Sequence, residues 1–100
     1  MKSILSNLNQ LLEVKSRQLT AAEKQLAKSV FGAHLQLDAI WIVAHRGVLK
    51  NYAISPNGNV YFNPQNWCED FSKRSLQQQS WLIHELISIS SIKIGNNHKF

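Results

Sequence analysis

Apolar residues recur at helical spacing near the start of the chain. In residues 3–18 they fall at i, i+1, i+4, i+7 and i+8, which predicts an amphipathic helix, and Ser3 is placed to cap it. The stripe consists of Ile4, Leu5, Leu8, Leu11 and Leu12. Such stripes usually pack on the domain core, but a docking helix over residues 1–18 is the functional alternative.

A second helix follows directly. Thr20 and Glu23 form an S/T-x-x-E capping box, and Gly32 is the expected stop. Apolar residues between them keep helical spacing. The sequence therefore predicts two N-terminal helices that meet near residues 17–19.

The period then changes from that of a helix to that of a strand. Alternation predicts a strand over residues 35–43, a turn at 45–47 and a second strand over 48–54. Residues 55–59, Ser-Pro-Asn-Gly-Asn, form a strong turn signal before a short strand at 60–62. We expect a small antiparallel sheet, with the hairpin over residues 48–62 as its best supported part.

The last helix is predicted over about residues 76–92. Ser75 offers a cap, with Gln78 in the place of the usual Glu. The apolar positions of this helix are too broad for a surface stripe, so it should be central. The fold class is therefore α+β: two N-terminal helices, a small antiparallel sheet and a C-terminal helix.

Length, charge and cysteine content restrict the class of protein. The 100 residues suggest a single domain over 1–100, and 11 basic against 6 acidic residues give a net charge of +5. The basic residues are spread along the chain, which disfavours a nucleic-acid interface. No secretory leader or membrane-length apolar run is apparent, and Cys68 alone cannot form an internal disulfide. We expect a cytoplasmic protein unless a secretion machine exports it.

The candidate chemistry lies in the last predicted helix, at His84 and Glu85. In the zinc-protease pattern H-E-x-x-H, two histidines at i and i+4 bind zinc and the glutamate polarises a metal-bound water. Here Ser88 stands where the second histidine should be. A zinc site would need another ligand, for which His98 is a weak candidate and His45 and His34 are alternatives. Otherwise the pair is a structural remnant, Glu85 is not catalytic, and no cofactor is expected.

Two other arrangements could carry chemistry. Cys68 could act as a nucleophile with His84 as its base, although a lone cysteine beside Trp67 is more often a small apolar filler. Glu69 and Asp70 could pair as acid and base, but adjacent carboxylates in a loop are usually caps or solvated charges. Most of the three tryptophans should be core, and an exposed one would mark a partner surface.

Several short segments carry a family resemblance. They are residues 19–23 (LTAAE), 30–32 (VFG), 37–38 (LD), 60–62 (VYF), 70–72 (DFS) and 82–86 (LIHEL). In these six segments the chain resembles the short zincin-like proteins encoded beside Vgr and Rhs elements of bacterial type VI secretion systems. In that family the last segment reads F-x-H-E-M-x-H, followed by an aromatic residue and glutamine. Ser88, Ser90 and Ser91 depart from that pattern.

The resemblance and its departures together imply a function. The chain would be a degenerate zincin-like interaction protein, without catalysis, that binds a type VI secretion component or an effector. The alternatives are a zinc metallopeptidase or hydrolase with an atypical ligand set, and an immunity-type inhibitor of an effector. The expected partner is a protein, either a type VI secretion component or an effector, with neither nucleic acid nor membrane insertion expected.

Overall fold

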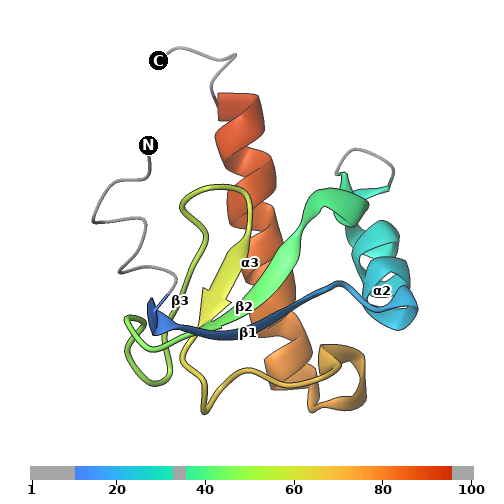
Figure 1. The fold of residues 1–100 in the computed structure, drawn as a ribbon. Helices are drawn as coiled ribbons and strands as arrows, with labels where there is room; N and C mark the ends of the chain where they lie inside the picture. The colour runs from blue at the N-terminus through green and yellow to red at the C-terminus, as the bar shows by residue number, and fades with distance from the viewer. Residues whose placement is uncertain (1–10, 33–35, 96–100) are drawn as a thin grey trace.

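One long helix lies behind a small sheet (Figure 1). The computed structural model describes residues 11–32 and 36–95. Its elements, in order, are β1 (Glu13–Gln18), α2 (Ala21–Phe31), η1 (Leu37–Ala39), β2 (Trp41–His45), β3 (Ala53–Ile54), β4 (Val60–Phe62), η2 (Phe71–Lys73) and α3 (Leu76–Gly95). The mixture of helices and a sheet confirms the α+β class. None of the described helices is long and apolar enough to span a bilayer.

Helix α2 has the boundaries that its sequence predicts. The Thr20 hydroxyl accepts a hydrogen bond from the Glu23 backbone N–H at 3.1 Å, and the Glu23 carboxylate accepts one from the Thr20 N–H at 3.0 Å. At the other end, the Gly32 N–H donates to the Lys28 carbonyl at 2.8 Å. Gly32 has φ of 68°, a backbone conformation in which a Cβ is unfavourable. The capping box and the glycine stop are confirmed.

The predicted helix over residues 3–18 is wrong at its C-terminal end. Residues 13–18 form strand β1, which pairs antiparallel with β2. Val14 is the only apolar residue in β1, so the helical stripe of apolar residues stops at Leu12. Beyond Leu12, pairing with β2 satisfies the backbone N–H and C=O groups. Leu11 and Leu12 are 72% and 39% exposed, against the expectation that they pack on the core. Residues 3–10 lie outside the described part.

Two predicted strands are shorter than expected. Residues 37–39 form a 3-10 turn, so β2 begins only at Trp41, and Leu35 lies outside the described part. Of the predicted strand 48–54 only Ala53–Ile54 is extended. The preceding loop turns instead, because Asn51 has φ of 69°, which no strand residue adopts.

The sheet is mixed, which corrects the predicted antiparallel one. Among the described strands the order is β1-β2-β4-β3, with β2 and β4 parallel. The hairpin of β3 and β4 is antiparallel as predicted, and its Gly58 has φ of 89°. Residues 60–62 are all buried, which requires neighbours on both sides, whereas the two-residue β3 suits an edge. Strand β4 therefore inserts beside β2.

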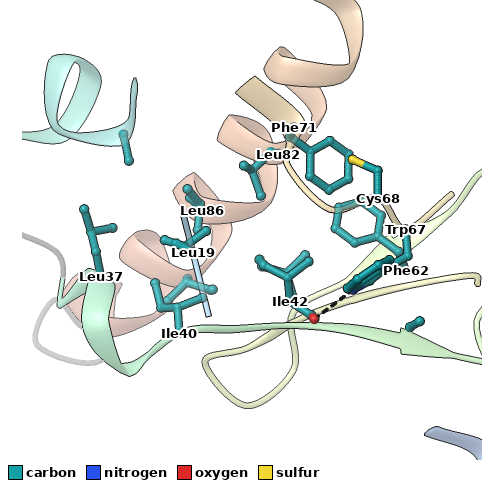
Figure 2. Packing of buried hydrophobic residues seen from close by; sticks show 14 residues of the cluster. Leu19, Leu37, Ile40, Ile42, Phe62, Trp67, Cys68, Phe71, Leu82 and Leu86 are labelled. Carbon is teal, nitrogen blue, oxygen red and sulfur yellow. Dashed lines mark hydrogen bonds between the residues drawn. The ribbon is translucent and has the colours of Figure 1, made fainter. Parts of the chain in front are cut away.

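The core lies between α3 and one face of the sheet. Ile42 of β2 and Phe62 of β4 belong to the same buried cluster as Leu82 and Leu86 of α3 (Figure 2). The indole N–H of Trp67 donates to the Ile42 carbonyl at 2.9 Å. The predicted helix 76–92 is confirmed and central, although it extends to Gly95. Its predicted cap is also formed, since the Ser75 hydroxyl accepts from the Gln78 N–H at 3.2 Å.

Candidate functional site

Glu85 connects α3 to the β-hairpin. Its side chain is buried, with the residue only 7% exposed, and its Oε1 accepts a hydrogen bond from the Ser55 hydroxyl at 2.6 Å. Ser55 directly follows β3, at the start of the turn to β4. A buried carboxylate needs such a donor, because an unpaired charge in the interior is costly. Glu85 therefore has a structural partner that sequence reasoning missed.

His84 lies in a different environment from Glu85. Adjacent helical residues point about 100° apart, and His84 is exposed. It lines an open groove between α2 and α3, together with Leu26 and Val30 of α2 and Ile83 and Ile87 of α3. The groove is mostly apolar. The structure thus places the imidazole at a surface groove and the carboxylate in a buried contact with the hairpin.

Ser88 makes a contact that suits a serine and not a metal ligand. Its hydroxyl donates to the His84 carbonyl one turn earlier, at 3.3 Å. This bond to the i−4 carbonyl is common for serine within helices. The hydroxyl at the i+4 position is thereby occupied by the backbone of its own helix.

The other histidines do not complete a site within the described residues. His45 is at the end of β2, where its ring packs edge-on against Tyr61 at 5.8 Å between centroids. Side chains alternate along β2, so His45 lies on the opposite face of the sheet from its neighbour Ala44. Because Ala44 packs in the core with α3, the sheet separates His45 from His84 on that helix. His34 and His98 lie outside the described residues.

The donors present in residues 11–32 and 36–95 do not fit a zinc centre. No group of three or more His, Cys, Asp or Glu side chains is close enough there to hold a metal ion. A catalytic zinc site takes three protein ligands and a water. The expectation that the protein binds no cofactor, with zinc as the alternative, stays a prediction.

Cys68 and the acidic pair take structural positions. Cys68 is buried in the core, and Figure 2 shows its sulfur beside the Phe71 ring. His84 is exposed on α3 and is not a member of that core cluster. The Glu69 side chain is 82% exposed, with Lys15 at 3.9 Å. Asp70 caps η2, since its carboxylate accepts from the Ser72 N–H at 2.9 Å and hydroxyl at 2.6 Å.

The pKa of Asp70 is lowered by its hydrogen bonds. Burial pushes this pKa upward, but the bonds from Ser72 and from the Thr20 side chain outweigh burial. The pKa of Asp38 is also lowered, chiefly by its hydrogen bond and charge interaction with Lys24. Both carboxylates connect neighbouring elements at the surface, which is a structural role.

A buried ion pair organises the centre of the domain. The Glu23 carboxylate is fully buried and accepts hydrogen bonds from the two terminal guanidinium nitrogens of Arg17, at 2.7 and 2.9 Å. It also accepts from the Phe71 N–H at 2.6 Å, and Arg17 Nε donates to the Cys68 carbonyl at 3.1 Å. This pair joins β1, α2 and η2. The capping box marked Glu23 in the sequence, but nothing there indicated its two distant partners.

The chain thus forms a small α+β domain whose long helix carries a His-Glu pair. No family model matches the chain. It is 33% identical over 87 residues to the type VI secretion system spike protein VgrG2b of Pseudomonas aeruginosa, in an alignment covering 81% of this chain and 8% of that protein.

A solved structure gives the same result. The chain superposes on the effector domain of Pseudomonas aeruginosa VgrG2b with a TM-score of 0.72 and 31% identity, over 79% of this chain and 46% of that domain. The chain thus spans less than half of the solved effector domain. This homology links the chain to Vgr elements of type VI secretion systems, and it confirms that part of the resemblance.

Proposed function

We propose that this protein acts in a type VI secretion system as a non-catalytic interaction protein, with a degenerate zincin-like helix. One observation carries the proposal: His84 and Glu85 lie in different environments, and a serine occupies the position of the second ligand. Glu85 is bonded to Ser55, Ser88 is bonded to the His84 carbonyl, and His84 faces an apolar groove. A protein partner, either a secretion component or an effector, would bind the domain.

The groove between α2 and α3 is the first surface to examine for that partner. Val30 and Ile87 expose 54% and 43% of their surface on opposite walls of it. Exposed apolar groups of this kind contribute more to binding than to folding. We expect Val30→Gln combined with Ile87→Gln to leave the melting temperature nearly unchanged and to reduce capture of a type VI partner from the native host.

The decisive variant is Glu85→Gln, which keeps the shape of the side chain and an oxygen for the Ser55 hydroxyl. If the protein is a binder, the variant retains full function in a secretion or competition assay. A far-UV circular dichroism spectrum checks that it is folded. The paired groove variant is the matched control, since it should lose function while Glu85→Gln does not.

A metallohydrolase is the second candidate, because the homologous domain is an effector domain and the order His84-Glu85 suits zincin chemistry. In that case Glu85 would move the proton of a water, and Glu85→Gln would abolish activity in a folded protein. That result would contradict our proposal. An immunity-type inhibitor is distinguished separately, because it would protect cells against an effector when expressed alone.

A further inference from the structure

A second hollow lies on another side of α3, near the start of the helix. It is lined by Asn51 and Asn66 from two loops and by Gln77, Gln78 and Trp81 from α3. All five side chains are neutral: four are carboxamides and one is an indole. We propose that this hollow is a binding site for a neutral saccharide.

The loop wall of the hollow is fixed by a reciprocal amide pair. The Asn51 N–H donates to Asn66 Oδ1 at 2.6 Å, and Asn66 Nδ2 donates to Asn51 Oδ1 at 3.2 Å. Asn51 holds this position with φ of 69°, which asparagine tolerates better than most residues. The backbone N–H of Asn66 is itself bonded to the Asn63 carbonyl at 2.8 Å. Two loop segments that lie 15 residues apart in sequence thus form one hydrogen-bonded edge.

The helix wall, by contrast, keeps polar groups available. Gln77 is exposed, and its side chain has no hydrogen bond to any described residue. Gln78 uses its side-chain oxygen for the Ser75 hydroxyl at 3.3 Å, which leaves its amide nitrogen to donate. The indole N–H of Trp81 likewise has no partner in the described ranges. These groups can serve a ligand without breaking a bond of the fold.

The chemistry of the lining selects the ligand class. Carboxamides both donate and accept, as sugar hydroxyls do, and an indole offers an apolar surface beside one N–H donor. Trp81 is held in a fixed orientation, perpendicular to Phe62 at 5.0 Å between ring centroids. A charged ligand such as a phosphate would find no opposite charge among these five residues. A neutral ring with several hydroxyls satisfies both walls.

The site is separate from the groove at His84, because the two share no lining residue. The inference therefore stands or falls independently of the function proposed above.

Nuclear magnetic resonance titration of the 100-residue chain tests it. The probes are maltotriose, tri-N-acetylchitotriose and, as a neutral non-sugar, trialanine amide. We expect at least one saccharide to shift the Trp81 indole and the Gln77 and Gln78 side-chain amide signals saturably, with Kd on the order of millimolar, a typical value for a few hydrogen bonds and one ring contact. Gln77→Ala should weaken binding by roughly fivefold, as loss of one hydrogen bond predicts.

Two further variants make the test specific. Trp81→Phe keeps an aromatic ring against Phe62 and removes the indole N–H, so it too should weaken binding. Gln25→Ala changes an exposed glutamine on α2, outside the hollow, and should bind as the unaltered protein does. Binding of neither saccharide, binding of the tripeptide alone, or equal effects of Gln77→Ala and Gln25→Ala would overturn the proposal.

Discussion

At the scale of single residues, two buried carboxylates hold distant segments of the domain together. Glu23 and Glu85 are both inside, and each has a hydrogen-bond donor from a distant segment. Glu85 shares burial with Glu23, but its donor is one serine hydroxyl, whereas Glu23 is bonded to an arginine and two backbone N–H groups.

Changing Glu23 should be the most destabilising single substitution of a charge in the domain. Glu23→Gln replaces a carboxylate oxygen by an NH₂ group, which would face the N–H donors of Arg17, Thr20 and Phe71. The change also leaves the Arg17 guanidinium without a negative partner. We expect a loss of about 3–5 kcal/mol in the free energy of unfolding, as for other broken buried pairs. Urea denaturation measures it. Glu69→Gln is the control, because its 82% exposed side chain should contribute about 0–1 kcal/mol. Equal midpoints for the two variants would contradict the assigned network.

Zinc affinity should depend on Ser88. Ser88→His places a second imidazole one turn from His84, on the same side of α3. We expect the unaltered protein to hold less than stoichiometric zinc and the variant to bind zinc measurably more tightly in a calorimetric titration. Gln25→His adds a histidine to an exposed site of α2 and serves as the control. About one tightly held zinc per unaltered chain would reject the degenerate-site account.

At the scale of elements, local signals were reliable where the partners are close in sequence. The α2 capping box, the Asn57-Gly58 hairpin turn and the Ser75 cap all form as predicted. Each depends on residues within one or two turns of the chain, so tertiary context could not easily override it. Strand β1 shows the converse, because its structure depends on pairing with β2.

The start of α2 gives a prediction at this scale. Thr20→Ala removes the hydroxyl that accepts from the Glu23 N–H and should cost about 1 kcal/mol of unfolding free energy, within a range of about 0.5–2. Thr20→Ser keeps the oxygen and should retain most of the stability. Thermal and chemical denaturation of the two variants make the comparison. An alanine variant as stable as the serine variant would show that the cap contributes nothing.

At the scale of the whole molecule, a small set of polar contacts joins segments that the core alone does not fix. Arg17 and Glu23 join β1, α2 and η2, and Ser55 joins the hairpin to α3. Asp70 adds a contact to Thr20 and so connects the turn before α3 with the start of α2. The arrangement of these elements should therefore respond to acid.

The pH dependence of stability should carry the signature of Asp70. Its folded pKa lies below the unfolded value of about 3.9, so ionisation favours the folded state. The contribution is complete above the unfolded pKa and is lost as the pH falls through the folded pKa. We expect Asp70→Asn to be less stable than the unaltered protein at neutral pH, with the difference vanishing in strong acid.

Urea midpoints measured from pH 7 down to about pH 2, across the range where carboxylates titrate, test this prediction. Glu69→Gln again provides an exposed control, which should show little difference at any pH. The difference in urea midpoint between Asp70→Asn and the unaltered protein should shrink on acidification. A difference that grew instead would contradict a lowered pKa of Asp70.

The sequence by itself determined the α+β class, the bounds of α2, the hairpin turn and the central C-terminal helix. These follow from short-range periodicity and capping, which act within a few residues. It also placed His84, Glu85 and Ser88 on one helix, since their spacing along the chain fixes that.

Only the tertiary structure decided the rest. Strand β1 replaced the C-terminal end of a predicted helix, and β4 was inserted beside β2. Both outcomes depend on which distant strand supplies the hydrogen bonds. The same reason applies to the site: Ser55 is 30 residues from Glu85, and the two met only through the packing of the hairpin on α3. Periodicity along a chain carries no information about such partners, and these partners decided the environment of the candidate site.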